Sequence, residues 1–256
     1  MLTALVTGAS RGIGAGIATQ LAQRQVRVIA HGKTRSAPLT QLVASLPNPT
    51  LNHVALAADL TDANTIEPFW QQVVAATSTL DILINNAGIY LLHDMVQTDT
   101  AQWDAAFLAT LQANLLTPAL LTQRVTRHML TQSAHEPFGR GRIVNISSRG
   151  AFRGEPQAPG YGAAKAGLNA FGQSLAQALA PQHIYTYTIA PGWVATDMAN
   201  PHLDGPMGAQ IKAQHPLGRV ASVAELANLA IYCALDAPAT MTGCVIDING
   251  ASYLRT

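Results

Sequence analysis

The chain has 256 residues, of which 48% are hydrophobic, so it can bury a sizeable core and does not belong to the disordered class. Only 11% of the residues are charged and the net charge is +1, with no basic run, which argues against nucleic-acid binding through phosphate contacts. The sequence shows no signal-peptide pattern, no 18-residue charge-free apolar span and no metal-ligand spacing among its histidines. We therefore expect a cytoplasmic protein with no metal and with no nucleic-acid or membrane partner.

Short apolar runs alternate along the chain with segments of helical spacing. The runs are continuous rather than alternating, which suits strands that helices cover on both faces. This order predicts an α/β fold with a doubly wound, parallel, seven-stranded sheet and right-handed crossovers. No linker divides residues 1–256, so we expect one domain, with loose stretches at 36–49, 133–141 and 200–216. The predicted strands are 2–6, 26–30, 53–57, 80–85, 142–147, 184–189 and 245–248.

The first predicted strand runs into a glycine cluster and then a helix. Gly8 permits a tight turn, Gly12 lets the backbone approach a pyrophosphate, and Gly14 allows the helix to pack closely on the strand. Free N–H groups and a partial positive charge at the helix N-terminus favour phosphate. The turn therefore indicates a dinucleotide site, with a purely structural turn as the alternative reading.

The end of the second strand distinguishes the two nicotinamide cofactors. An NAD site places an acidic residue there to bind the ribose 2′-hydroxyl. Here the stretch reads His31-Gly32-Lys33-Thr34-Arg35, without an acid, and Arg11 in the glycine turn adds a further cation. A 2′-phosphate needs such partners, so we expect NADP(H); the alternative is that Lys33 and Arg35 are solvated loop charges.

Tyr161 and Lys165 begin another helical segment and lie one turn apart on the same face. A free tyrosine has a pKa of about 10, and a neighbouring ammonium favours the phenolate, so we expect Lys165 to lower the pKa of Tyr161. Ser148 follows the strand at 142–147, where parallel sheets bind ligands and where its hydroxyl can meet a reacting carbonyl oxygen.

In this order, the glycine turn, Ser148, Tyr161 and Lys165 resemble the short-chain dehydrogenase/reductase family, in its short single-domain branch with a Rossmann-type fold. The resemblance covers essentially the whole chain. It includes Asp59-Leu60 for adenine, Asn85-Asn86-Ala87-Gly88 along the cofactor channel, the segment Pro191–Thr196 for the nicotinamide amide, and the C-terminal stretches Pro216–Arg219 and Met241–Gly243.

The resemblance implies a catalytic tetrad of Asn114, Ser148, Tyr161 and Lys165, with Tyr161 as general acid in reduction and base in oxidation. Lys165 would lower the pKa of Tyr161 and bind the nicotinamide ribose, Ser148 would polarise the carbonyl, and Asn114 would relay protons through a water. The implied cofactor-binding residues are Gly8, Ser10, Arg11, Gly12, Ile13, Gly14, His31, Gly32, Lys33, Asp59, Leu60, Asn86, Ala87, Gly88, Tyr161, Lys165, Pro191, Gly192, Val194 and Thr196.

The chain departs from the family's pattern at three places. Asn114 follows Trp103-Asp104 by ten residues instead of about six, an excess near one helical turn that would preserve its facing. Tyr187 stands where the family commonly has an asparagine, and Asn249-Gly250-Ala251 replaces a terminal Asp-Gly-Gly. These two changes leave the catalytic groups intact.

Several other side chains are expected near the mouth of the site. Tyr90, Phe152, Trp193 and Met198 shape an apolar substrate pocket or simply pack in the core. Arg149 and Arg153 meet an anionic substrate or, as the preferred reading, are solvated loop charges. The segment 200–214, rich in Pro and Gly, is expected to form a mobile lid.

The leading functional hypothesis is NADPH-dependent reduction of a small-molecule carbonyl, a ketone or keto ester, to a secondary alcohol. The alternative is a 3-oxoacyl-[acyl-carrier-protein] reductase, whose acidic carrier needs a basic docking surface; residues 166–211 contain no Lys or Arg, which weakens this alternative. A lower alternative is a non-catalytic NADP(H)-binding sensor. The Ala-rich stretch 166–180 suits burial between subunits, so a homo-oligomer, tetramer or dimer, is expected.

Overall fold

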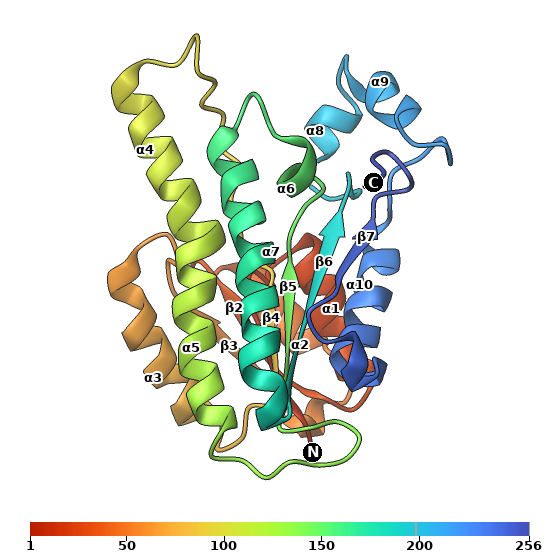
Figure 1. Cartoon of the computed structure of the whole chain (residues 1–256). Helices are drawn as coiled ribbons and strands as arrows, with labels where there is room; N and C mark the ends of the chain where they lie inside the picture. Colours follow the sequence, from red (N-terminus) through yellow and green to blue (C-terminus); the bar gives the residue numbers. More distant parts are fainter. Residues whose placement is uncertain (198, 256) are drawn as a thin grey trace.

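A computed structural model describes residues 1–197 and 199–255 of the chain (Figure 1). Its centre is one seven-stranded parallel sheet in the order β3-β2-β1-β4-β5-β6-β7. The predicted α/β class is therefore confirmed, and so are all seven strands to within two residues at each end. The strands are β1 (Thr3–Val6), β2 (Arg27–Gly32), β3 (Val54–Ala57), β4 (Ile82–Asn85), β5 (Gly141–Ile146), β6 (Ile184–Pro191) and β7 (Val245–Ile248).

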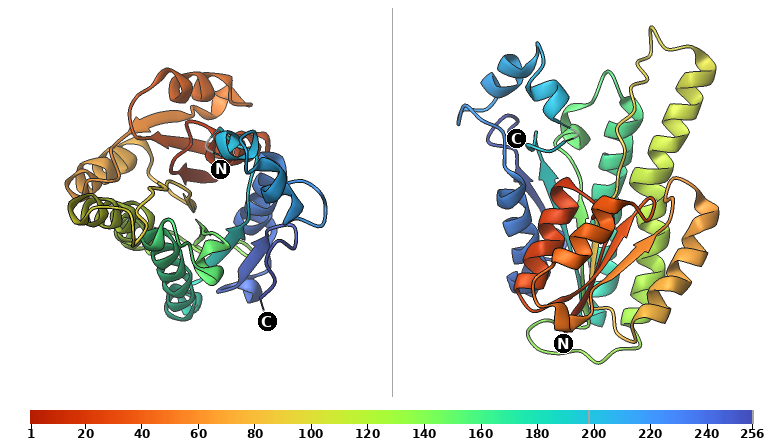
Figure 2. Two further views of the ribbon diagram at one scale, coloured as in Figure 1. Left: turned by 90° about the horizontal axis from the view of Figure 1, so that it is seen from above. Right: turned by 180° about the vertical axis from the view of Figure 1, so that it is seen from behind.

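Helices cover both faces of this sheet, as the two views of Figure 2 show. The helices are α1 (Gly12–Gln23), α2 (Ala37–Ser45), α3 (Ile66–Ala76), α4 (Thr100–Leu111), α5 (Thr117–Met129), α6 (Gly150–Arg153), α7 (Pro159–Leu179), α8 (Asn200–Leu203), α9 (Gly208–Ala213) and α10 (Val223–Ile231). Short 3₁₀ turns lie at Pro49–Leu51, Ala63–Thr65, Ala180–Gln182 and Ala239–Met241, and π turns at Gln112–Leu116 and Tyr232–Asp236. The topology changes direction between β1 and β4, which is where open parallel sheets bind ligands.

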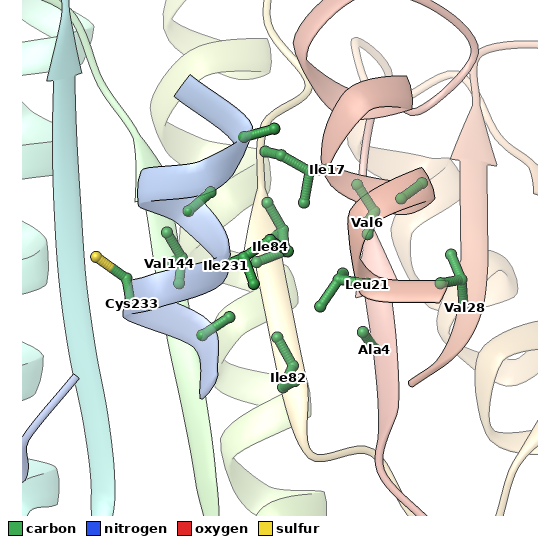
Figure 3. Packing of buried hydrophobic residues seen from close by; sticks show 14 of the residues in the cluster. Ala4, Val6, Ile17, Leu21, Val28, Ile82, Ile84, Val144, Ile231 and Cys233 are labelled. Carbon is green, nitrogen blue, oxygen red and sulfur yellow. The ribbon is translucent and has the colours of Figure 1, made fainter. Parts of the chain in front are cut away.

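Alternate residues of each strand enter different cores because side chains alternate across a strand. Ala4 and Val6 of β1 pack with Ile17 and Leu21 of α1, on the face that α10 also covers (Figure 3). Leu5 of β1 lies in the second core, which includes side chains of α3 and α5. Covering both faces explains why these strands read as continuous apolar runs.

Two of the expected loose stretches contain helices. In the stretch 36–49, α2 begins just after Ser36, with Pro38 in its first turn, where the missing N–H of proline costs nothing. Leu39 is fully buried, and Leu42 and Val43 pack on the same core, so tertiary contacts stabilise this helix. The polar and proline residues of the stretch had made it look like a loop in the sequence. The stretch 200–216 likewise contains α8 and α9.

The helices α4 and α5 join through the π turn at Gln112–Leu116 into one long helical segment, Thr100–Met129. By length and composition alone, this segment is long and apolar enough to cross a membrane, a span that the sequence did not predict. In this fold, however, α5 packs on α3 and on β4, and α4 packs on α7 (Figure 1). Core helices of soluble proteins pass the same test, so the segment is weak support for a membrane span.

Candidate active site

A pocket of about 460 Å³ lies at the carboxyl ends of the strands. The four residues of the predicted tetrad line it, and so does every predicted cofactor-binding residue except Gly32. Gly32 ends β2 and instead faces Leu39 of α2, where a Cβ would lie 3.1 Å from the leucine Cδ2. The fold thus brings together groups that are more than 180 residues apart in the sequence, from Gly8 to Thr196.

The glycine turn connects β1 to the N-terminus of α1 at one end of the pocket. Gly8 has φ +64° and Gly12 has φ +55°, both in the left-handed region that favours glycine. A Cβ on Gly14 would lie 2.3 Å from the carbonyl oxygen of Gly8, so only glycine fits inside this turn. The exposed Arg11 precedes the first helical residue, and the free N–H groups of α1 face the pocket.

His31 holds this turn as a neutral group rather than as a cation. Its Nδ1 accepts the N–H of Gly8 at 3.2 Å, so Nε2 carries the hydrogen and donates to the carbonyl of Ala58 at 3.0 Å. Burial lowers the pKa of His31 to about 4. His31 therefore lines the pocket but adds no positive charge to it, and its ring braces the glycine turn against the end of β3.

Lys33 and Asp59 form an ion pair, Nζ to Oδ2 at 3.0 Å, across the ends of β2 and β3. Hydrogen bonds from Thr61 and then Lys33 hold the pKa of Asp59 below its usual range. Lys33 is two-thirds exposed and lines the pocket, whereas Arg35 is exposed and lies outside the lining. Of the three cations that the sequence offered for a 2′-phosphate, Lys33 and Arg11 therefore line the pocket and Arg35 does not.

Two asparagines at the end of β4, Asn85 in the strand and Asn86 just after it, support the backbone that surrounds the pocket. The amide of Asn86 donates to the carbonyls of Thr7 and Gly8 at 2.9 and 3.1 Å, which fixes the end of β4 against the glycine turn. Asn85 is buried and donates to Asn145 and Thr122. Asn86, Ala87 and Gly88 line the pocket, and Asn85 supports them from the core.

Ser148, Tyr161 and Lys165 meet at the other end of the pocket. Lys165 is 4% exposed, and its ammonium donates to the carbonyl of Ile146 at 2.8 Å. The same Nζ lies 5.7 Å from the centre of the Tyr161 ring. The Ser148 hydroxyl accepts the N–H of Gly150, the first residue of α6, at 3.0 Å. This bond fixes the orientation of the serine side chain.

In this structure the pKa of Tyr161 is raised and not lowered, although Lys165 lies beside it. Burial raises the pKa of Tyr161 to about 12, and a hydrogen bond with Ser148 only partly opposes the rise. Burial also lowers the pKa of Lys165 to about 8. The physical reason is that removal from water penalises both charged forms, while the ammonium is directed to a backbone carbonyl. Tyr161 is therefore held as a proton donor.

Asn114 lies in the π turn between α4 and α5 and is fully buried. Its amide nitrogen donates to the carbonyls of Ile89 and Thr110, and its oxygen accepts the N–H of Ile89 at 3.1 Å. A Cβ on Gly88 would lie 2.5 Å from the Asn114 oxygen and 3.6 Å from the Lys165 nitrogen. The longer spacing from Trp103 thus still brings Asn114 to the lysine end of the pocket, at a π turn of the kind that occurs often at functional sites.

The mouth of the pocket is more polar than the sequence suggested. Tyr90 lies edge-on to Tyr161 with ring centres 5.0 Å apart, and Trp193 stacks at a tilt on His202 of α8. Both Tyr90 and Trp193 line the pocket, Phe152 does not, and Met198 lies outside the described residues. Arg153 and Glu155 also line it, 3.6 Å apart. Reasoning from the sequence missed Glu155, although it lies between two catalytic motifs.

Arg149 is buried, so the preferred interpretation of this residue as a solvated loop charge is wrong. It is 3% exposed, and its guanidinium donates to Gln214, just beyond α9, and to Ser252 near the C-terminus. Burial lowers the pKa of Arg149 to about 10. Its side chain therefore joins the segment beside Ser148 to the predicted lid and to the C-terminal tail.

Comparisons with known proteins identify a family and relatives to which this chain is similar. The profile of the family described as short chain dehydrogenase matches residues 2–205. The chain is 35% identical over 251 residues to the 3-oxoacyl-[acyl-carrier-protein] reductase of Escherichia coli (strain K12), covering 98% of this chain and 97% of that one. It is 31% identical over 252 residues to the reductase of the same name from Staphylococcus aureus (strain Mu50), covering 98% of each chain.

Among solved structures, a putative gluconate dehydrogenase from Agrobacterium tumefaciens matches with a TM-score of 0.86 and 29% identity, covering 98% of this chain and 95% of that one. A putative NAD(P) dependent gluconate 5-dehydrogenase from Beutenbergia cavernae, solved with bound NADP at low occupancy, matches with a TM-score of 0.84 and 28% identity. It covers 98% of this chain and 96% of that one.

Proposed function

The chain belongs to the short chain dehydrogenase family of oxidoreductases, and we propose that it uses NADP(H) to reduce the 3-oxo group of an acyl thioester. The observation that carries the proposal is one pocket with Lys33 at one end and Ser148, Tyr161 and Lys165 at the other. Relatives at 31–35% identity over 98% of the chain, named for this reaction, support the substrate class above that of other ketones.

NADPH, when bound, supplies the hydride that the carbonyl carbon receives. The protein supplies the proton and the placement. Ser148 donates a hydrogen bond to the carbonyl oxygen, and Tyr161 transfers its phenolic proton to that oxygen as charge develops there. Lys165 carries the neighbouring positive charge that stabilises the phenolate left behind. Asn114, bound to the backbone beside Gly88, keeps the lysine end of the pocket in place.

The choice of NADP(H) over NAD(H) rests on Lys33 in our proposal. The stretch 31–35 contains no acidic residue to bind a 2′-hydroxyl, and Lys33 is the cation of this stretch that reaches the pocket lining. A charged 2′-phosphate gains a charge-assisted hydrogen bond there. His31, being neutral, contributes to the shape of the turn and not to this preference.

A second candidate, reduction of a free polar ketone or keto ester, is favoured by the mouth of the pocket. The Arg153 and Glu155 side chains line it, and an apolar acyl chain would have to remove them from water. The residues 166–211 contain no Lys or Arg for docking an acidic carrier, and Arg124 is already paired with Glu67 at 2.7 Å. The gluconate dehydrogenases among the structural neighbours are named for such a polar substrate.

Oxidation of NADPH, followed by its absorbance, separates the candidates. Acetoacetyl groups are compared on an acyl-carrier protein, on coenzyme A and as a simple ester, together with hydroxylated ketones. The proposal expects the highest kcat/KM for the thioesters. A preference for hydroxylated ketones would establish the second candidate, and NADPH binding without turnover on every carbonyl would leave only the sensor.

Three further parts of the proposal concern the whole molecule. We place the cofactor and substrate sites in one domain, the protein in the cytoplasm, and the active form as a homo-oligomer. The outer side of the long helix Thr100–Met129 supports the last point, since Leu108, Leu116 and Leu120 are 43–64% exposed there. Light scattering tests it, and a monomer at micromolar concentration would refute it.

A further inference from the structure

His93 lies fully buried in the loop that follows β4, and both of its ring nitrogens are hydrogen-bonded. Nε2 accepts the backbone N–H of Gly160 at 3.0 Å, and Nδ1 lies 2.8 Å from the carbonyl oxygen of Leu91. An N–H only donates and a carbonyl only accepts, so the two partners select one neutral tautomer, with the hydrogen on Nδ1.

The group that His93 binds is the start of the helix that carries Tyr161. A helix leaves its first N–H groups without partners inside the helix, and a side chain of the preceding residue often accepts one of them. Here the preceding residue is Ala158, which has no such side chain, and Pro159 has no N–H. Gly160 therefore presents the first free N–H of α7, directly before Tyr161, and His93 caps it from a segment 67 residues away.

The ring of His93 is held firmly enough to act in this way. It packs edge-on to Trp103 and Phe107 of α4, with ring centres 6.0 and 6.1 Å away. Its backbone N–H donates to the carbonyl of Gln157 at 2.9 Å. A Cβ on Gly160 would lie 2.9 Å from Nε2, so the capped residue has to be small.

The neighbours of His93 in the sequence contact the same centre. Ile89 exchanges two hydrogen bonds with Asn114, and Tyr90 lies edge-on to Tyr161. The short segment 89–93 thus contacts two members of the tetrad directly and the residue before Tyr161 through His93. It braces the catalytic centre from outside the motifs that mark the site in the sequence.

We propose that His93 is a positioning residue for the reaction: its neutral imidazole caps α7 and thereby fixes the distance from Tyr161 to the substrate oxygen. The inference rests on the proposed role of Tyr161 as proton donor. Small displacements of a reacting group are costly, and about 1 Å lowers a rate by roughly 10²-fold. Loss of the cap should therefore lower kcat and leave NADPH binding unchanged.

Substitution of His93 by glutamine or by asparagine tests its two hydrogen bonds one at a time. In His93→Gln the longer side chain brings an acceptor close to the place of Nε2, so the cap on Gly160 is retained. In His93→Asn the amide reaches only the place of Nδ1, so the bond to Leu91 remains and the cap is lost. His93→Phe keeps the packing on Trp103 and Phe107 and loses both bonds.

We expect His93→Gln to keep kcat within about threefold of the parent, and His93→Asn and His93→Phe to lower it by about 10- to 100-fold. The dissociation constant of NADPH, measured by fluorescence, should stay the same in all three. Assays run well below the lowest melting temperature, which is measured for each variant. Gly160→Ala, which pushes against Nε2, should lower kcat in the same way.

Equal kcat for His93→Asn and His93→Gln would overturn the inference, as would a loss of kcat that follows the melting temperature alone. An NMR spectrum showing the hydrogen of His93 on Nε2 would also overturn it, without any activity measurement. Failure of the proposed function has a different signature: the parent would reduce no carbonyl, or Tyr161→Phe would remain active.

Discussion

The two ends of the pocket are built in different ways. The cofactor end consists mainly of backbone: the turn at Gly8 to Gly14 offers N–H groups, and His31 and Asn86 brace it with neutral hydrogen bonds. The catalytic end consists of side chains from the loop after β5, from α7 and from the π turn before α5. It holds a buried lysine and a tyrosine whose pKa values both move toward the neutral forms. The cofactor end therefore depends on local chain geometry, whereas the catalytic end depends on contacts between distant segments.

The sharpest test of the catalytic end is Tyr161→Phe, which removes the proton donor and leaves the ring packing. Turnover should fall by about 10²- to 10⁴-fold, the usual contribution of general acid catalysis, with NADPH binding retained. Tyr90→Phe is the matched control, since Tyr90 lines the same pocket edge-on to Tyr161 and should stay active. The assay is steady-state NADPH oxidation beside a fluorescence titration; an active Tyr161→Phe would remove the distinction between the two ends.

The cofactor end should instead be sensitive to acid through His31. Its folded pKa is lowered from 6.5 to about 4, so the unfolded chain takes up a proton that the native protein does not. Stability contributed by this residue is therefore present above pH 6.5 and is lost as the pH falls toward 4, by up to about 3 kcal/mol. Denaturant unfolding at both pH values, for the parent and for His31→Gln, measures it. If the free energy of unfolding fell equally in the two proteins between these pH values, His31 would not be the source of the acid sensitivity.

Lys33 and Arg35 form a natural pair for testing the NADP(H) preference. Lys33→Ala should raise the KM for NADPH by about 10- to 100-fold, the value of one charge-assisted hydrogen bond, and leave the KM for NADH almost unchanged. Arg35→Ala should change neither, because Arg35 lies outside the pocket lining. Steady-state kinetics of both variants with NADPH and with NADH measure these KM values. A larger effect at Arg35 would mean that the loop binds the phosphate in another arrangement.

The smallest effect is expected at Arg149, which joins the catalytic segment to the stretch after α9 and to the C-terminal tail. Arg149→Met keeps much of the buried volume and removes those bonds, so the segment after α9, which the sequence predicts as a lid, should loosen. We expect the KM for the carbonyl to rise by roughly three- to tenfold, with NADPH binding unaffected. A change in NADPH binding instead would show that Arg149 acts on the cofactor end.

The sequence predicted the sheet and most of the residues that line the pocket, although not Glu155. The seven apolar runs gave the strands because strands covered on both faces need apolar residues at every position. The glycine cluster gave the turn because Gly8 and Gly12 occupy conformations that other residues disfavour. In both cases the signal lies in neighbouring residues, and a local constraint decides the structure.

The tertiary structure alone decided the charge states and the support of the site. In the sequence Arg149 has the pattern of a loop charge, but the fold buries it and bonds it to Gln214 and Ser252. The pKa of Tyr161 is raised despite the neighbouring Lys165, because burial penalises the charged forms of both groups. His93 carries no motif, and its role arises only where the loop after β4 meets the uncapped start of α7. Burial and long-range hydrogen bonds depend on segments that meet only after folding, so the order of residues determines which groups are present, and the fold determines which of them are charged, buried and held in place.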